Sequence, residues 1–381
     1  MRTLQLWTFP FCPTPPVWQL DWSAIEQHFV CIRQMADCPQ NPLYHAEGDV
    51  LTHTRLVCEA LVRLPTWQQL PESERSVLFA AALFHDVGKP LCTRIDPEGN
   101  ITSRGHVPRG ARFTRQLFWE GEEASAPFTI REQIVALVRF SGLPFHFLDE
   151  SNPQYAVIRA SQQVRCDWLS ILAEADLGGR ICNDSPQMLE KIALFREFCT
   201  ENHCLDTLYA FASDHSRFIY FRKENSHPEY AAYDDTRFEV VLMCALPGTG
   251  KDYWIAHNLQ GWPMVSLDAL REEMDIAPED EQGPVIAEAR ELARTYLRQH
   301  KSFVWNATNV TRSRRGRLID LFIDYGARVR IVYLEVPPAE VLRRNRERER
   351  VVPEGVIWNM AAHLELPEIT EAHHVEWIVQ S

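Results

Sequence analysis

The sequence predicts a protein of two domains, an all-α N-terminal domain and a C-terminal α/β domain with a parallel sheet flanked by helices. Its 381 residues are many for one domain and enough for two. Up to Phe211 apolar residues recur at helical spacing, whereas from Phe238 short apolar runs alternate with helical segments. The expected domains are residues 1–213 and 238–381, joined by a polar, aromatic linker at 214–237.

Composition narrows the class of protein. A hydrophobic content of 45% and a charged content of 24% are typical of globular chains, and no apolar run reaches transmembrane length. The net charge of −13 argues against broad binding to a nucleic-acid backbone, but not against a local basic site. Ten cysteines without a C-x-x-C pair suggest neither a zinc ribbon nor a disulfide framework. With no signal peptide, we expect a reducing, cytoplasmic setting.

The N-terminal half reads as a series of helices. Helical spacing begins around Trp22 and Ile25, and a helix that contains His53 is expected after the turn residues near Pro42. The expected helices are 49–64, 74–85, one starting near 106, 130–140 and 162–176.

Two histidines and two aspartates recur on these helices. His85 and Asp86 are adjacent at the end of an apolar helix, His53 lies upstream and Asp176 downstream. Imidazole and carboxylate ligands together suit a transition metal such as Mn, Fe, Co or Ni. A metal bound there can lower the pKa of water to about 7, which would produce a nucleophile for phosphorus. The order H…HD…D resembles the HD phosphohydrolase superfamily.

That resemblance implies further roles. His106 would belong to a second metal or to phosphate binding, and Lys89 and Arg180 would hold the phosphate. Ser141 stands where relatives often have another histidine, and His146 is close but out of register. The competing interpretation is that His-Asp pairs are common and that helical histidines are usually hydrogen-bonded or solvated. The remaining histidines are taken as structural or surface residues: His28, His45, His203, His215 and His227.

The C-terminal half opens with FEVVLMCALPGTGKD, residues 238–252. A buried strand, a glycine loop and a helix form a phosphate cradle, in which backbone N–H groups and a lysine bind the phosphates of ATP or another NTP. The expected nucleotide-binding residues are Pro247, Gly248, Thr249, Gly250, Lys251 and Asp252. Ala245 replaces the usual first glycine, and Asp252 replaces the Ser/Thr that ligates Mg²⁺.

Strands are expected at 238–244, 264–266, 302–305 and 329–334, with helices between them. Asp268 follows the second strand, at the edge of the sheet where α/β domains bind ligands. The S-x-D-x-x-R spacing to Arg271 resembles the acceptor site of polynucleotide kinases, in which the aspartate is the base for a 5′-OH and the arginine holds a neighbouring phosphate. Alternatively, Asp268 caps the next helix.

Asn306 ends the third strand where relatives commonly have an acidic residue. We therefore expect that Asp252 supplies the negative charge toward Mg²⁺ and that Asn306 hydrogen-bonds to it. The alternative is that Asp252 only caps its helix. Arg312 and Arg315, which follow this strand, are candidates for a phosphate-facing patch, with a solvated helix face as the default.

The spacing R-N-x-x-R, Arg344 to Arg348, resembles the lid of phage-type polynucleotide kinases. Lid arginines stabilise charge on the transferring phosphoryl group. Arg346 and Arg350 have the same spacing, and a helix held in solvent by salt bridges to the interleaved glutamates is the competing interpretation.

In its order of motifs the chain resembles the bacterial HD-Pnk family, an HD phosphohydrolase fused to a P-loop polynucleotide kinase. The resemblance implies NTP-dependent phosphorylation of 5′-OH ends and metal-dependent removal of 2′,3′-cyclic or terminal phosphates, upstream of a ligase. The expected cofactors are ATP or another NTP with Mg²⁺, and Mn, Ni or Co in the HD site. The partners would be RNA or DNA termini. The alternatives are an HD nucleotide phosphohydrolase regulated by an ATP-binding domain, and a scaffold with decayed sites.

Overall fold

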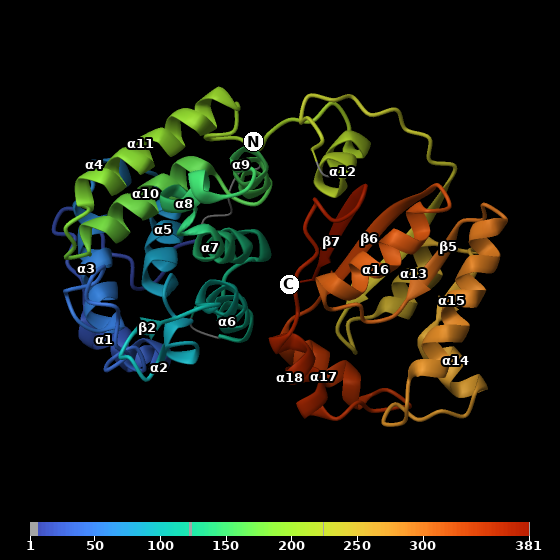
Figure 1. The fold of residues 1–381 in the computed structure, drawn as a ribbon. Helices are drawn as coiled ribbons and strands as arrows, with labels where there is room; N and C mark the ends of the chain where they lie inside the picture. Colours follow the sequence, from blue (N-terminus) through green and yellow to red (C-terminus); the bar gives the residue numbers. More distant parts are fainter. Residues whose placement is uncertain (1–6, 122–123, 224, 381) are drawn as a thin grey trace. The chain divides into compact units, whose positions relative to one another are not determined.

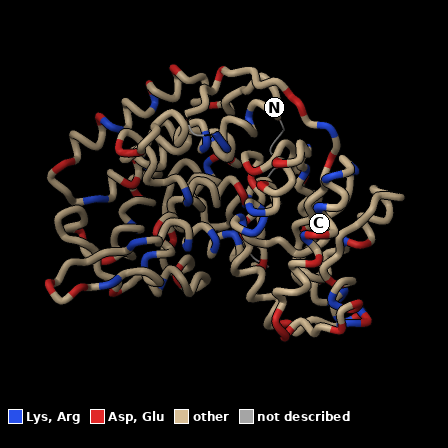
Figure 2. Tube along the Cα trace, turned by 45° about the vertical axis from the view of Figure 1, so that its right-hand side comes forward, with Lys and Arg blue, Asp and Glu red and all other residues tan. Residues whose placement is uncertain are grey.

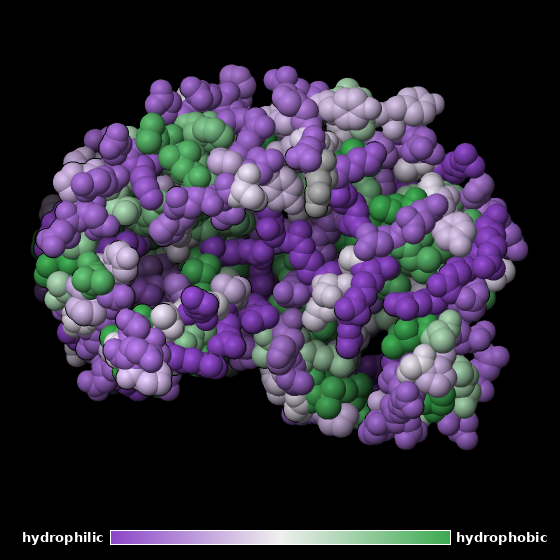
Figure 3. Space-filling view, in the orientation of Figure 1, coloured by the Kyte–Doolittle hydropathy of each residue, from purple (hydrophilic) through white to green (hydrophobic). Residues whose placement is uncertain are grey.

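The structure is a computed structural model that describes residues 7–121, 124–223 and 225–380. The chain divides into two compact units, Met1–Tyr209 and Ala210–Ser381, each with its own elements (Figure 1). Acidic and basic residues are interspersed along the trace of each unit (Figure 2). On the face seen in Figure 3, hydrophobic side chains form separate patches among polar ones. Among the described residues, no helix has both the length and the apolarity needed to cross a membrane.

The first unit is built from helices around one apolar core. Helix α5 lies at its centre, because Val77 to Phe84 are fully buried, and α3, α7 and α10 pack against it. The helices are α1 Trp22–His28, α2 Val30–Arg33, α3 Val50–Arg63, α4 Pro65–Gln68, α5 Glu72–Phe84, α6 His106–Glu120, α7 Phe128–Phe140, α8 Leu143–His146, α9 Pro153–Ser161, α10 Cys166–Gly178 and α11 Ser185–Glu201, with short 3₁₀ turns at Lys89–Leu91 and Phe147–Asp149.

The helical class predicted for this unit is confirmed, with three differences in detail. The helix expected at 162–176 starts later, as α10 at Cys166, and a separate helix, α9, ends just before it at Ser161. Helix α11 was not expected. A small antiparallel hairpin, β1 Arg94–Ile95 with β2 Ile101–Thr102, interrupts the helices. Its strands have two residues each, too few for alternation to show in the sequence.

The second unit holds a five-stranded parallel sheet in the order β4-β5-β3-β6-β7, which confirms the predicted α/β class. The P-loop strand β3 is central, and α15 packs against β4 and α16 against β6. The strands are β3 Phe238–Ala245, β4 Met264–Ser266, β5 Phe303–Asn306, β6 Ala327–Glu335 and β7 His374–Val379. The helices are α12 Asp214–Arg222, α13 Lys251–Asn258, α14 Leu267–Glu273, α15 Gly283–Arg298, α16 Arg312–Ile323, α17 Pro338–Arg346 and α18 Glu354–Ala362.

The linker prediction for 214–237 is wrong for its first part. Those residues form α12, which Ser213 caps, and which belongs to the second unit. Arg217 donates to the backbone oxygens of Ile369 and His373, at 3.1 Å each, and the Phe218 ring stacks on His373 with 4.0 Å between centroids. The aromatic side chains of this segment therefore pack against the C-terminal segment of the chain. Edge strand β7 was also missed, since its polar residues mask the apolar pattern.

His373 makes the second unit sensitive to acid. Burial, together with the charges of His215 and Arg328, lowers the pKa of His373 from 6.5 to about 3, and its Nδ1 accepts a hydrogen bond of 3.1 Å from the Val329 N–H. In the unfolded chain His373 is therefore protonated below about pH 6.5, whereas in the folded unit it stays neutral until the pH is near 3. We expect full stability above pH 6.5 and a loss as pH falls toward 3, amounting to about 2 kcal/mol at pH 5.

The measurement is urea unfolding of the second unit between pH 7 and pH 5. His373→Asn, whose side-chain oxygen can still accept from Val329, is expected to flatten this dependence. The exposed residue His363 provides the control His363→Asn, which should keep it. Equal pH slopes in the wild type and His373→Asn would contradict the assignment.

Candidate functional sites

Four of the predicted metal ligands meet in the first unit. His53 comes from α3, His85 and Asp86 follow the end of α5, and Asp176 comes from α10. His53 Nε2 lies 3.2 Å from Asp176 Oδ1 and 3.4 Å from His85 Nε2, and His85 Nε2 lies 3.3 Å from Asp86 Oδ2. The four side chains, separated by up to 123 positions in the sequence (176 − 53 = 123), converge on one buried point.

Gly88 brings the fifth residue to this cluster. A Cβ on Gly88 would lie 2.2 Å from the backbone oxygen of His106, so only glycine lets the start of α6 approach the turn after Asp86. His106 Nε2 thereby lies 3.6 Å from Asp86 Oδ1. The turn that contains Gly88 thus sets how closely α6 packs against the end of α5.

The three histidines present the same nitrogen to the cluster. The Nδ1 atoms of His85 and His106 lie 2.7 Å from the backbone oxygens of Ala82 and Ser103, and His53 Nδ1 lies 2.8 Å from Glu47 Oε1. The Nε2 atom of each ring is therefore the nitrogen that faces the cluster, and it can bind a metal once it carries no proton. Three such nitrogens and two carboxylates fit a transition metal of the Mn, Fe, Co or Ni class.

Lys89 and Arg180 lie against the carboxylates. Lys89 Nζ is 2.6 Å from Asp86 Oδ2 and donates to Gln40 Oε1 at 2.7 Å, whereas Arg180 makes two bonds to Asp176, of 2.9 and 2.6 Å. Burial alone would raise the pKa of both aspartates. The Lys89 and His85 charges outweigh burial at Asp86, and those of Arg180 and His53 outweigh it at Asp176, so both pKa values are held well below the ordinary range. Both carboxylates are therefore ionised and ready to bind a cation.

Sequence reasoning missed Glu47 and assigned His45 to a structural or surface role. Glu47 Oε1 lies 2.8 Å from His45 Nδ1 as well as from His53 Nδ1, and its Oε2 accepts from the Ile181 N–H at 2.9 Å. Burial would raise the pKa of Glu47, but His53 and the Ile181 N–H lower it to about 2. Glu47 is thus a buried carboxylate that orients His53. The H-x-E spacing just before α3 was the available signal.

Glu47→Gln is expected to weaken transition-metal binding to this cluster by about 10- to 100-fold, because the neutral amide holds the His53 Nδ1–H more weakly and keeps only one accepting oxygen. Equilibrium dialysis of the full chain with Mn²⁺ or Ni²⁺ measures the affinity. Glu59→Gln, which removes a surface ion pair with Arg63, is the control. Equal affinity in the wild type and Glu47→Gln would rule out this role.

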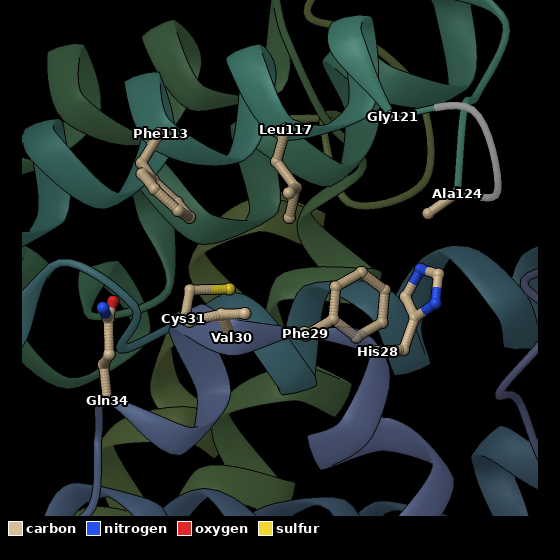
Figure 4. Close-up of a pocket in the computed structure, with 9 residues that line it drawn as sticks. All are labelled: His28, Phe29, Val30, Cys31, Gln34, Phe113, Leu117, Gly121 and Ala124. Atoms are coloured by element: carbon tan, nitrogen blue, oxygen red, sulfur yellow. The ribbon is translucent and has the colours of Figure 1, made fainter.

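Ser141 and His146 do not extend the cluster. The Ser141 hydroxyl donates to the Val138 backbone oxygen at 3.1 Å, and the His146 side chain is 66% exposed beside Asp149. A separate apolar pocket of about 420 Å³, lined among others by Phe29, Phe113 and Leu117, shares no residue with the metal cluster (Figure 4).

In the second unit the loop after β3 has the geometry of a phosphate cradle. Gly248 and Gly250 have φ of +84° and +93°, which favour glycine, and a Cβ on Gly248 would lie 2.7 Å from the Val341 backbone oxygen. Ala245 is still part of β3, and its N–H donates to the Thr308 oxygen at 3.0 Å. Its extended conformation requires no glycine, so this departure from the usual motif leaves the loop intact.

Lys251 is the first residue of α13 and directly follows the glycine loop. Its Nζ is 3.5 Å from the Leu246 backbone oxygen, a weak contact that leaves it available to a ligand. Burial lowers the pKa of Lys251, and the carboxylates of Asp252 and Asp268 offset part of that effect. Beside the loop, a cavity of about 390 Å³ is lined by Gly250, Tyr253 and Trp254 and by Ile378 of β7.

Asn306 donates to Asp252 Oδ1 over 2.6 Å, the contact expected from the sequence. An amide oxygen facing a carboxylate would be repelled, so this orientation of the amide is the favourable one. The other end of the side chain, Asn306 Oδ1, is buried and has no hydrogen-bond partner among the described residues. A carboxylate beside an unsatisfied amide oxygen fits Mg²⁺, which prefers oxygen ligands.

Asp252→Asn is expected to raise the Mg²⁺ concentration for half-maximal kinase activity by about 10- to 100-fold, because it removes the one carboxylate of this pair. A Mg²⁺ titration at saturating NTP measures it. The exposed carboxylate of Asp324 supplies the control Asp324→Asn. Unchanged Mg²⁺ dependence in Asp252→Asn would leave that residue only as a helix cap.

Asp268 and Arg271 form an ion pair on α14. The helix is capped by the hydroxyl of Ser266, which accepts from the Ala269 N–H at 3.3 Å, so Asp268 does not serve as its cap. The Asp268 side chain is 77% exposed, and Arg271 Nε donates to Gln282 Oε1 at 2.6 Å. Asp268 is therefore accessible to a ligand and lies within electrostatic range of Lys251.

The lid arginines fall into two groups. Arg344 Nη1 donates to the Thr249 backbone oxygen at 3.3 Å, and the charge of Arg348 acts on Lys251. Arg346 and Arg350 pair with Glu354 and Glu272, and Arg344 itself also pairs with Glu340. Of the two pairs with the same spacing, the one predicted first is thus nearer the P-loop. Buried Asn345 holds the following turn through two bonds to the Val352 backbone.

The phosphate-facing role considered for Arg312 and Arg315 is wrong. Arg315 is fully buried in a two-bond ion pair with Glu371, at 2.8 and 2.9 Å, and Arg312 pairs with Glu368 at 2.8 Å. These arginines anchor α16 to the segment before β7. Their partners lie more than fifty positions away, so the arginine cluster alone could not reveal them.

Comparisons with known proteins agree with this geometry in the second unit. Residues 240–367 match the model of the AAA domain, a match confined to that unit. A stretch of 75 residues is 43% identical to the CC-adding tRNA nucleotidyltransferase of Thermus thermophilus, which is 19% of this chain and 15% of that protein. The chain thus spans only a small part of this relative.

Solved structures with some likeness include a presumed kinase from Chloroflexus aurantiacus J-10-fl (15% identity, TM-score 0.33, 38% of this chain and 86% of that one). A second is a gluconokinase from Sinorhizobium meliloti 1021 (20% identity, TM-score 0.28, 38% of this chain and 86% of that one). The match of the AAA domain model and the loop geometry together identify the second unit as a kinase-like P-loop domain, which implies an NTP with Mg²⁺.

Proposed function

We propose that the chain is a bifunctional enzyme that heals RNA ends. Its second unit would phosphorylate 5′-OH ends with an NTP, and its first unit would hydrolyse 2′,3′-cyclic or terminal phosphates. The observation that carries the proposal is the accessible Asp268–Arg271 pair near Lys251, since a domain that only senses ATP needs no acceptor base. The resemblance of the motif order to HD-Pnk proteins, and the short identity to an enzyme named for tRNA, support a polynucleotide acceptor.

In the kinase reaction Lys251 and the loop amides bind the donor phosphates, and the donor nucleoside occupies the cavity beside Tyr253 and Trp254. Asp268 accepts the proton of the 5′-OH. The 5′ oxygen forms a bond to the γ-phosphorus while the bond between that phosphorus and the β–γ bridging oxygen breaks. Arg271 holds the neighbouring phosphate of the strand, and Arg344 and Arg348 stabilise charge on the transferring group. Asp252 and Asn306 would hold Mg²⁺, which supplies charge neutralisation at the phosphates.

In the hydrolase reaction the ligands would be His53, His85, Asp86 and Asp176, with His106 at the rim of the cluster. A transition metal held there supplies Lewis-acid activation of water and phosphate. Lys89 and Arg180, the cations nearest the cluster, contact the substrate phosphate, and Glu47 keeps His53 in the tautomer that binds metal. The water oxygen bonds to phosphorus as the bond to the 2′ or 3′ oxygen breaks, and the proton that the water loses ends on that leaving oxygen.

The test uses a short RNA with a 5′-OH and a 2′,3′-cyclic phosphate, incubated with ATP and separately with Mg²⁺, Mn²⁺, Ni²⁺ or Co²⁺. The expected products carry a 5′-phosphate and a free 3′ end, which a ligase can join. A DNA strand of the same sequence tests the preference for sugar. Unchanged RNA at both ends, with hydrolysis of free nucleotides instead, would favour a nucleotide phosphohydrolase regulated by ATP.

A further inference from the structure

We propose that Cys166, Cys199 and Cys204 of the first unit form a closed thiolate site for a soft d¹⁰ cation, Zn²⁺ or Cu⁺. The site is independent of the histidine–aspartate cluster and of the proposed catalytic functions. The ten cysteines of the chain are free thiols, and these three are the ones whose sulfur atoms gather within the described residues.

The three sulfurs come from three separate pieces of chain. Cys166 is the first residue of α10, Cys199 lies in the last turn of α11, and Cys204 follows that helix. All three residues are fully buried, and their sulfur atoms lie within 4.8 Å of one another. Sulfurs that share a metal at the Zn–S distance of about 2.3 Å are about 3.8 Å apart, so the cluster can close on an ion with small shifts.

The backbone fixes this arrangement. After α11 the chain reverses through His203, whose φ of +51° is unusual for a residue other than glycine. The Cys204 N–H donates to the Cys199 oxygen at 2.9 Å, and the Asp167 N–H donates to the Leu205 oxygen at 2.8 Å. The returning segment is therefore bonded both to the end of α11 and to the start of α10, and the thiols are held together without a bound ion.

The three thiols differ in acidity. Hydrogen bonds from Cys166 and Cys199 lower the pKa of Cys204 to about 4, whereas the hydrogen bonds within the cluster and burial raise the pKa of Cys166, and the hydrogen bond with Cys204 and burial raise that of Cys199. A soft cation that binds here would displace the protons of the two weaker acids. Thiolates select Cu⁺ and Zn²⁺ over hard cations, so the class of ligand differs from that of the nearby histidine–aspartate cluster.

The number of ligands distinguishes Cu⁺ from Zn²⁺ at this site. Cu⁺ is satisfied by three thiolates, whereas Zn²⁺ takes a fourth ligand. His203, which precedes Cys204 in the chain and is exposed, is the candidate for that fourth ligand. Either ion would tie α10 and α11 to the segment that ends this unit at Tyr209.

The experiment uses the reduced, metal-free full chain, with Co²⁺ as a spectroscopic probe. We expect a sulfur-to-cobalt charge-transfer band that grows as Co²⁺ is added until the site is filled and that is bleached by Zn²⁺ or Cu⁺. Cys204→Ser should weaken binding by on the order of 100-fold, since loss of a ligand costs at least as much as loss of its supporting partner. Cys58→Ser, at another fully buried cysteine, is the matched control and should keep the band.

Histidine and carboxylate ligands give no sulfur-to-cobalt charge-transfer band. Cobalt bound in the histidine–aspartate cluster therefore cannot produce the expected signal. Absence of the band in the wild type, or its persistence in Cys204→Ser, would show that the three cysteines are only packed thiols. If Cys204→Ser does not fold, X-ray absorption of the wild type loaded with enough Zn²⁺ to fill both clusters decides: sulfur neighbours at about 2.3 Å support the site, and their absence overturns it.

Discussion

Lys251→Ala is expected to reduce phosphorylation of 5′-OH ends by on the order of 10³-fold and to leave hydrolysis of the 2′,3′-cyclic phosphate unchanged. Lys251 is the positive side chain within the loop made by Gly248 and Gly250, and it has no strong hydrogen bond of its own. Its ammonium group can therefore follow the phosphate charge as it develops. Removal of one such preorganised donor typically costs 10²–10³-fold in rate.

The measurement is single-turnover transfer of labelled phosphate from ATP to a 5′-OH RNA. Lys301→Ala, an exposed lysine of the same unit, loses the same charge outside the loop and should behave as the wild type. A Lys251→Ala enzyme that still transfers phosphate at the wild-type rate would refute the assignment of the donor site. A loss of both activities would instead indicate that the substitution disturbs folding.

His85→Ala should have the opposite effect, abolishing removal of the 3′ phosphate while kinase activity persists. His85 Nε2 lies within 3.4 Å of both His53 Nε2 and Asp86 Oδ2, so its loss opens the cluster on one side. Because supporting partners of metal ligands are already worth 10- to 100-fold, we expect a loss greater than about 100-fold for a ligand itself.

Release of phosphate from a terminal 3′-phosphate RNA and opening of the cyclic phosphate are measured in parallel, with Ni²⁺ or Mn²⁺ present. The control His146→Ala removes a histidine whose side chain is 66% exposed, and it should be silent. Full hydrolase activity in His85→Ala would mean that the cluster does not carry this reaction. The two variants together separate the activities, which a single active site shared by both reactions would not allow.

Local sequence patterns were sufficient to predict the structure wherever a residue acts together with its neighbours in the sequence. Strand β3, the glycines of the loop and the contact between Asp252 and Asn306 were all foreseeable, because each follows from apolar runs or from motif positions. The meeting of His53, His85, Asp86 and Asp176 was expected only through resemblance. Spacing in the sequence cannot show that three helices bring their histidines to one point.

Contacts that depend on tertiary structure remained hidden. Glu47 reaches His53 only because the loop before α3 is tied to Ile181, and Arg315 is neutralised by a glutamate 56 positions away. The three cysteines of the thiolate cluster follow no motif spacing, and β7 is an edge strand with polar residues. In each case the deciding partner lies far along the chain.

Arg348 differs from the other lid arginines in its ion pairing, and this difference affects how the protein responds to salt. Arg343, Arg344, Arg346 and Arg350 each have a carboxylate within ion-pair distance, whereas no described carboxylate lies that close to Arg348. Paired charges cancel at a distance, so the charge of Arg348 adds to that of Lys251 in the field that an approaching triphosphate meets. At physiological ionic strength the Debye length is about 8 Å. Capture of the donor should therefore slow as salt is added.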